Sequence, residues 1–255
     1  MQKTILNHGL TLKYFFLNTF YTPPPKSNHP EGCYQQAMRD FKELLRLEYI
    51  AELPTTRKKV KDTRRRVLYY VTRKGAQSIG RIRDYWRPKE IKSHNNIEHT
   101  SMVADICRSF LLNYHDQFKI TYNKSVNRKK YDALISDMKT GHDYLLEVDR
   151  EYPYHQKRVI TETCKKWGFN LAKFGLAKNT KVLIVYSCIT FDVLMRPQEY
   201  TDQIRQNAKR DFDKLLLKAE GLSDKFRFMD FIDFYKLNKS VWYTPKGEKC
   251  KLINW

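Results

Sequence analysis

Three carboxylates near the middle of the chain have the residue types and spacing of a divalent-metal site. Asp132 lies in one strand-like run, and Glu147 and Asp149 lie two residues apart in the next. Because alternate residues of a strand point to one face, the Glu147 and Asp149 side chains should point together. Carboxylate oxygens that converge at a strand edge suit Mg²⁺, which can polarise a phosphodiester and lower the pKa of an attacking water. We therefore expect these three residues to be metal ligands and catalytic groups, with Mg²⁺ as the cofactor.

The elements that must position these carboxylates follow one another in a regular order. The pattern predicts a helix over residues 95–114, strands over 118–122, 131–137 and 143–149, a helix over 154–174 and a buried strand over 181–188. The turn at 138–142 has the composition of a hairpin. A long charged helix is predicted over 197–219, and strands within 225–235 and 241–255. This order resembles the restriction-endonuclease-like core, of PD-(D/E)XK topology, which contains a mixed sheet.

The chain departs from such nucleases at one position. They usually carry a lysine two residues after the glutamate, where it stabilises negative charge, but this chain has Asp149 there. Lys157 is the candidate substitute, with Lys165 and Lys166 as alternatives on the same predicted helix. A second interpretation is that the three carboxylates form salt bridges with the basic helix over 157–178 and bind no metal.

The N-terminal third has the pattern of a small DNA-binding domain. Residues 32–49 predict an amphipathic helix, 50–53 and 67–72 predict strands, and Thr11 is expected to cap an earlier helix. Seven of the ten residues at 57–66 are basic. A helix fits the major groove of B-DNA, and a basic hairpin tip can lie along the neighbouring phosphates. The candidate DNA-binding residues are Gln35, Gln36, Arg39, Lys42, Arg57, Lys58, Lys59, Lys61, Arg64, Arg65, Arg66, Arg73 and Lys74.

Two resemblances extend these expectations. The helix at 34–45, the hairpin and the closing segment 68–75 (LYYVTRKG), in which a Thr cap and a Gly turn lead into a last helix, resemble winged helix-turn-helix domains. The segments 130–134 (KYDAL) and 145–150 (LLEVDR) resemble the replication-relaxation family of plasmid and mobile-element proteins. That resemblance spans roughly residues 5–187 and implies a winged helix joined to a restriction-endonuclease-like core. The charged, Pro-containing stretch 83–96 predicts a domain boundary near Lys89. We therefore expect an α+β chain with a winged helix-turn-helix domain over 1–88 and a restriction-endonuclease-like α/β domain with a C-terminal extension over 89–255.

Charge and composition favour a polyanionic partner. The 255 residues contain 48 Lys and Arg against 28 Asp and Glu, which gives a formal net charge of +20. Neutralising phosphates releases counterions, so nucleic acid is the leading partner. The five cysteines include no CxxC pair, which predicts neither a disulfide framework nor a zinc cluster. Residues 1–21 lack the pattern of a secretion signal, and we expect a cytoplasmic protein without a membrane partner.

The sequence leaves three functions open. The first is a double-stranded DNA-binding protein of a plasmid, phage or transposable element, acting in replication, mobilisation or transposition with other proteins of that element. The second is a Mg²⁺-dependent DNA endonuclease that uses Asp132, Glu147 and Asp149. The third is a plain transcriptional repressor. A homodimer is expected, because paired winged helices read two half-sites.

Overall fold

The computed structural model describes residues 10–12, 30–53, 68–80, 82, 97–114, 117–122, 125–126, 129–150, 180–187 and 202–252. The chain divides into two compact units, residues 1–108 and 109–255, each of which is described by itself. The boundary expected near Lys89 and the helix expected over 154–174 lie outside the described residues. No helix in the described ranges has both the length and the apolar character that crossing a bilayer requires.

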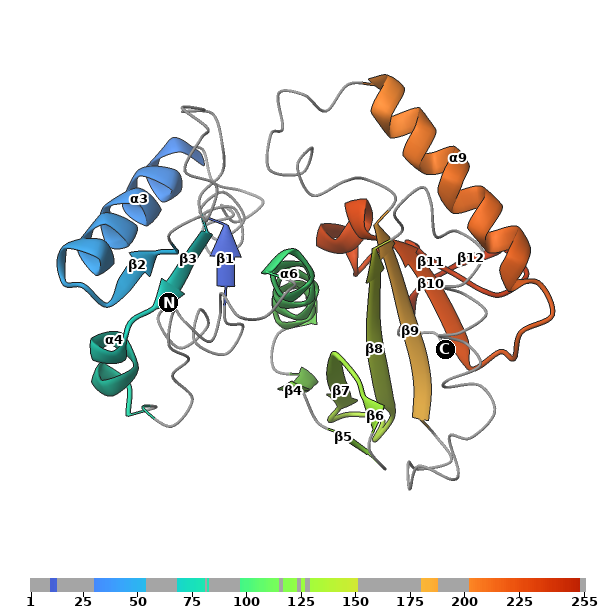
Figure 1. The fold of residues 1–255 in the computed structure, drawn as a ribbon, viewed down its shortest axis with the longest axis horizontal. Coiled ribbons are helices and arrows are strands. Elements are labelled where there is room, and N and C mark those ends of the chain that lie inside the picture. The colour runs from blue at the N-terminus through green and yellow to red at the C-terminus, as the bar shows by residue number, and fades with distance from the viewer. Residues whose placement is uncertain are drawn as a thin grey trace. The chain divides into compact units, whose positions relative to one another are not determined.

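The first unit contains a small antiparallel sheet flanked by helices (Figure 1). The sheet has the strand order β1-β3-β2, and Ile50 of β2 and Leu10 of β1 pair with Val71 and Tyr70 of the central strand β3. Its elements are β1 (Leu10–Leu12), α3 (Pro30–Arg46), β2 (Ile50–Glu52), β3 (Leu68–Val71) and α4 (Arg73–Ser78). The predictions of α3, β2 and β3 are confirmed to within about three residues at either end, and the expected short helix after β3 is present as α4.

One prediction in this unit is wrong. Thr11 does not cap a helix, because it lies in β1, where it pairs with Tyr69. The central strand β3 has two edges, and β2 occupies only one of them. Pairing along the second edge satisfies the main-chain groups of β1. The residues expected to form the helix, from 13 onward, lie outside the described residues.

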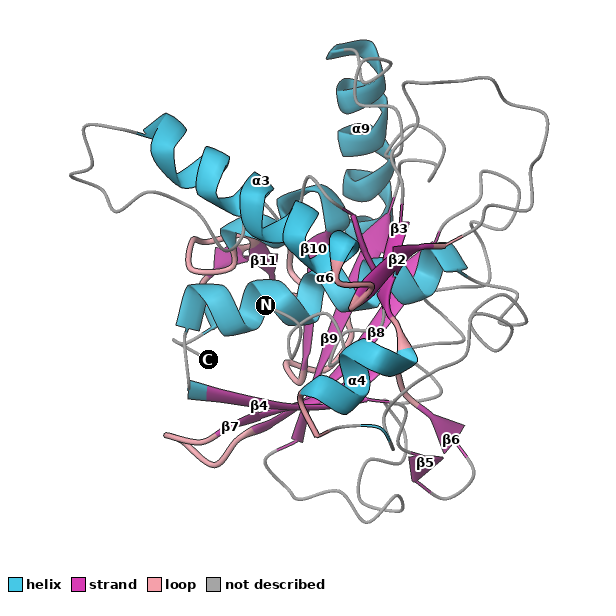
Figure 2. Cartoon of the chain, turned by 90° about the vertical axis from the view of Figure 1, so that its left-hand side faces the viewer, coloured by secondary structure: helices cyan, strands magenta, loops and turns pink. Residues whose placement is uncertain are grey.

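The second unit is built on a mixed seven-stranded sheet with the order β12-β11-β10-β9-β8-β7-β4. Strands β8, β9 and β10 are parallel neighbours, and the other pairs are antiparallel. Figure 2 shows the pair β4 and β7 side by side at one edge. The strands are β4 (Phe118–Tyr122), β7 (Ala133–Asp137), β8 (Asp143–Arg150), β9 (Thr180–Ser187), β10 (Phe226–Asp230), β11 (Trp242–Tyr243) and β12 (Lys249–Cys250), with a separate two-stranded sheet of β5 (Ser125–Val126) and β6 (Lys129–Lys130).

The two faces of the sheet are covered by different helices (Figure 1). On one face α9 (Asp202–Ala219) packs Phe212, Leu215 and Leu216 into a core with Leu145 and Ile184 of the sheet. On the other face lie the last turns of α6 (Ile97–Tyr114), a helix that spans the division between the units. There the Phe110 ring lies 5.4 Å from the Phe118 ring and 6.4 Å from the Trp242 ring, and Tyr114 Oη donates a hydrogen bond of 2.5 Å to the Leu237 carbonyl.

Most of the expected elements of this unit are confirmed, including the hairpin turn between β7 and β8. In that turn Asp137 N donates to His142 O at 2.8 Å, and Gly141 adopts a φ of 70°, which glycine accepts without strain. The strand expected over 225–235 is too long, because β10 ends at Asp230 and a 3₁₀ helix, η5 (Phe231–Lys236), follows. Asp230 Oδ1 accepts from Ile232 N at 3.2 Å, and this cap turns the chain out of the sheet.

Candidate nucleic-acid interface

Helix α3 presents one apolar side to its sheet and one polar side to solvent. Phe41 is 1% exposed, and its ring meets the Tyr69 ring edge-on at 4.8 Å. The opposite side carries four exposed residues at steps of four, three and four, which places them on one ridge of the helix. We call this ridge the α3 stripe: Gln35, Arg39, Lys42 and Arg46.

Sequence reasoning found three members of the α3 stripe and missed Arg46. The signal was present, because Arg46 lies one turn beyond Lys42. Arg46 forms two hydrogen bonds with the carboxylate of Glu43, at 2.7 and 2.5 Å, and these bonds lower the pKa of Glu43. Within the described ranges neither Arg39 nor Lys42 is ion-paired, so both cations remain available for an external anion.

The other candidate on α3 lies beside the stripe. Gln36 is exposed, and its Nε2 donates to Asp40 Oδ1 at 2.7 Å. This bond holds the Gln36 side chain against the next turn of the helix. Gln36 therefore lies on the flank of α3, whereas Arg39 lies at the centre of the exposed side of the helix.

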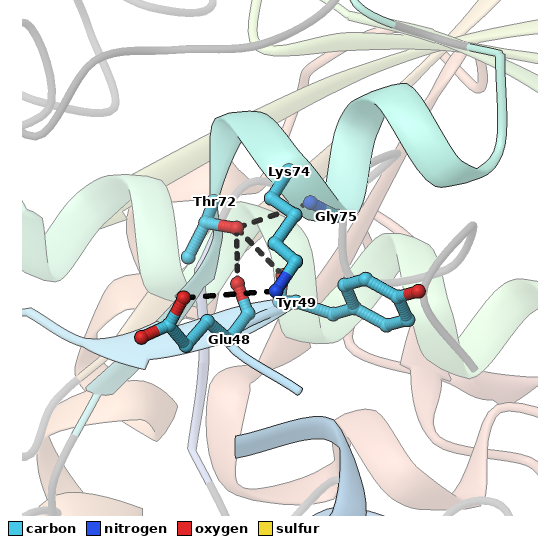
Figure 3. Close-up of polar contacts among 5 residues, drawn as sticks. All are labelled: Glu48, Tyr49, Thr72, Lys74 and Gly75. Atoms are coloured by element: carbon cyan, nitrogen blue, oxygen red, sulfur yellow. Dashed lines mark hydrogen bonds and ion pairs between the residues drawn. The ribbon is translucent and has the colours of Figure 1, made fainter. Parts of the chain in front are cut away.

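A hydrogen-bonded corner locks the end of α3 to the start of α4 (Figure 3). The Thr72 hydroxyl donates to Glu48 O at 2.6 Å and accepts from Gly75 N at 3.1 Å, as the expected helix cap does. Thr72 N donates to Tyr49 O at 3.0 Å. One side chain thus ties together the turn after α3, the end of β3 and the first turn of α4.

Gly75 is required in this corner for reasons of space. A Cβ at this position would lie 2.1 Å from Tyr49 O and 2.9 Å from Tyr49 C, which are backbone atoms that the corner holds in place. No side chain fits there without moving the backbone. The glycine of the 68–75 segment therefore permits the close approach of α4 to the turn after α3.

The remaining candidates of this unit differ in their surroundings. Lys74 lies 3.7 Å from a Glu48 carboxylate oxygen and 5.9 Å from the centre of the Tyr49 ring, and Arg73 is exposed. Lys74 is thus partly engaged in the corner, and Arg73 is more accessible to an anion. The seven basic residues of the connection between β2 and β3 lie outside the described residues: Arg57, Lys58, Lys59, Lys61, Arg64, Arg65 and Arg66.

The carboxylates of the second unit lie on neighbouring strands. Asp132 precedes β7, and its Oδ2 accepts a 2.7 Å hydrogen bond from Val148 N, between Glu147 and Asp149 on β8. Glu147 is 7% exposed, and it shares the α9 side of the sheet with Leu145 and Asp149.

Metal binding by these carboxylates stays a prediction. In the part of the chain that the structure describes, no three His, Cys, Asp or Glu side chains are grouped so as to hold a metal ion. One oxygen of Asp132 is already used to hold β8. The predicted auxiliary residue Lys157 lies outside the described residues.

Asp230 is a site residue that the sequence did not indicate. The parallel register places Asp149, Tyr186 and Asp230 in one row at the carboxyl ends of β8, β9 and β10. Asp230 is 7% exposed, and burial raises its pKa to about 7, with a smaller contribution from the charges of Asp233 and Asp213. A carboxyl group that is half protonated near neutral pH can donate as well as accept a proton. Only the strand pairing brings Asp230 into this row, because 80 residues of chain lie between it and Asp149.

Comparisons with known proteins identify no family. No family model matches the chain. No curated protein matches it. Among solved structures the chain is similar to SfsA of Pyrococcus furiosus in complex with Ca²⁺, with a TM-score of 0.26 and 17% identity over 49% of this chain and 53% of that one. The chain thus spans about half the length of SfsA, and so low a TM-score carries no argument about fold or function.

Proposed function

We propose that the protein binds double-stranded DNA, with α3 as the helix that enters the major groove. The α3 stripe carries this proposal. It combines an amide, which can bond to base edges, with cations that can bind phosphates or guanine, and its Arg39 and Lys42 have no ion pair within the described ranges. A net charge of +20 adds a general attraction to a polyanion.

The arrangement around α3 supports a winged helix-turn-helix assignment for the first unit. The order α3, β2, β3 and α4 is that of a recognition helix, a two-stranded wing and a closing helix. In this proposal the basic residues of the β2–β3 connection contact the phosphates beside the groove. The wider setting that we propose follows the replication-relaxation resemblance: a mobile-element protein that acts in replication, mobilisation or transposition, as a homodimer on two half-sites.

A salt titration of DNA affinity tests the proposal. The double variant Arg39→Ala/Lys42→Ala should bind duplex DNA more weakly than the native chain, and its plot of log K against log salt should be shallower by about 2, because each phosphate contact contributes about 0.9 to the slope. The matched control is Lys239→Ala/Lys246→Ala, which removes two exposed lysines of the second unit. Equal slopes for the two variants would contradict a role for α3.

A second candidate function is metal-dependent cleavage of DNA, favoured by Glu147 and Asp149 on one face at the end of β8. Glu147→Gln keeps the volume of the side chain and removes its charge. Under this candidate, Mg²⁺- or Mn²⁺-dependent nicking of supercoiled plasmid is lost in the variant while duplex binding survives. Binding without nicking by either protein would leave a DNA-binding protein on a nuclease-like scaffold.

A further inference from the structure

Helix α9 has a polar side on which cations outnumber carboxylates. Five residues of the helix are buried and define the side that faces the sheet: Ala208, Phe212, Leu215, Leu216 and Ala219. At 3.6 residues per turn the opposite side carries three amides and three cations. We call this side the α9 outer face: Gln203, Gln206, Asn207, Arg210, Lys214 and Lys218. Asp213 and Leu217 are exposed on the same side, and Asp202 and Asp211 lie at its margins.

Two of the amides on the α9 outer face, those of Gln203 and Asn207, are joined by a hydrogen bond, and Arg210 bonds to the second of them. Gln203 Nε2 and Arg210 Nη2 both donate to Asn207 Oδ1, at 3.2 and 3.3 Å. These bonds join side chains on successive turns, so they reduce the rotamer freedom that binding would otherwise remove. The three bonded side chains, Gln203, Asn207 and Arg210, follow one another along the helix axis.

The first turns of α9 gain little from packing on their own unit. No residue from Asp202 to Asn207 is buried, and the first buried residue of the helix is Ala208. Figures 1 and 2 both show this end of α9 extending beyond the strands of the sheet. Leu217, on the outer side, is 73% exposed. A helix normally gains its stability by burying one face, so a projecting end with ordered polar side chains is suited to contact a partner.

We propose that the α9 outer face is a second DNA-binding surface, separate from the α3 stripe, and that it takes B-form duplex DNA. Its three cations suit phosphates, and its amides suit phosphate oxygens or base edges. The major groove of B-DNA admits an α-helix, whereas the major groove of A-form RNA is too narrow for side chains to read. Lys214 lies 3.6 Å from Asp211 in an exposed ion pair, which costs little to exchange for a phosphate.

The test compares full-length variants in the same salt titration. The face variant is Arg210→Ala/Lys214→Ala/Lys218→Ala, in which alanine preserves the helix. The charge-matched control is Lys239→Ala/Lys246→Ala/Lys251→Ala, which removes three exposed lysines outside α9. Circular dichroism and thermal unfolding establish that each variant is folded. We expect the face variant to lower the salt slope for duplex DNA by about 2 to 3 relative to the native chain, and the control to lower it by less than about 1.

The outcomes separate this surface from the α3 stripe. A reduced slope in the face variant supports the proposal whether or not the α3 variant also binds weakly. Equal slopes for the face variant and its control would overturn it, and they would leave the α3 proposal to its own test. Duplex RNA that competes as well as duplex DNA, with the same dependence on the three cations, would overturn the assignment to B-form DNA.

Discussion

Replacing Asp230 by asparagine should remove most of the pH dependence of stability that this carboxyl group contributes. Asp230 is 7% exposed, and burial raises its pKa from 3.8 to about 7. Between these two values the folded chain holds a proton that the unfolded chain has lost. The free energy of unfolding therefore falls as the pH rises through this window, and is constant above about pH 7. A shift of about 3 pKa units corresponds to about 4 kcal/mol.

Asparagine does not titrate and can still accept the bond from Ile232 N, so the cap of η5 survives. The free energy of unfolding of the native chain should therefore fall relative to that of the Asp230→Asn variant as the pH rises from 4 to 8, by up to about 4 kcal/mol. Its stability at pH 4 alone is less informative, because the new amide N–H groups need partners of their own. Urea unfolding followed by tryptophan fluorescence at several pH values measures the difference directly.

The prediction is tested by comparing how the free energy of unfolding depends on pH in the native chain and in the Asp230→Asn variant. A difference in unfolding free energy that stays constant from pH 4 to pH 8 would refute the raised pKa of Asp230. A difference that grows toward low pH would mean that the group is ionised in the fold and stabilises it. Only a difference that grows as the pH rises and levels off near pH 7 agrees with a buried, protonated carboxyl group.

Substitutions at three further positions test the geometry described above. Gly75→Ala should destabilise the first unit by at least about 2 kcal/mol in urea unfolding, since its Cβ would lie 2.1 Å from Tyr49 O; a neutral effect would mean that the corner is loosely held. Thr72→Val should cost about 1 kcal/mol, through the lost cap of α4, and Thr72→Ser should recover most of it. Asp137→Ala should cost about 1 kcal/mol at neutral pH. Burial alone would raise the pKa of Asp137, but the hydrogen bonds that its carboxylate accepts, first from Lys139 N, lower this pKa below 3.8. The cost of Asp137→Ala should therefore shrink as the pH falls through the lowered pKa. A cost that does not change with pH would mean that these hydrogen bonds are absent.

The sequence predicted those elements whose signals are local. Strand β9 was found because residues 181–188 form a continuous apolar run, and α3 because its apolar positions recur at helical spacing. The hairpin at 138–142 was found from its turn residues. In each case the residues that decide the structure are neighbours along the chain.

The features that the sequence did not predict depend on pairing between distant segments. Thr11 joins the open edge of β3 instead of capping a helix, and no local pattern reveals this partner. Asp230 joins the row of Asp149 and Tyr186 only through the parallel register. The Asp132 carboxylate was expected to point to a metal, and nothing in its own segment indicated the bond to Val148 N.

The mixed sheet of the second unit also determines an order of folding. Strands β7 and β8 are joined by the short turn at 138–142, so their pairing closes a small loop. Pairing of β8 with β9 closes a longer loop, which contains residues 151–179. Pairing of β9 with β10 closes a loop that contains the whole of α9. Because closing long loops costs more entropy, we expect the hairpin to form early and the parallel centre of the sheet late. The row of Asp149, Tyr186 and Asp230 is assembled by those last pairings, so the carboxyl groups are brought together only as the chain completes its fold.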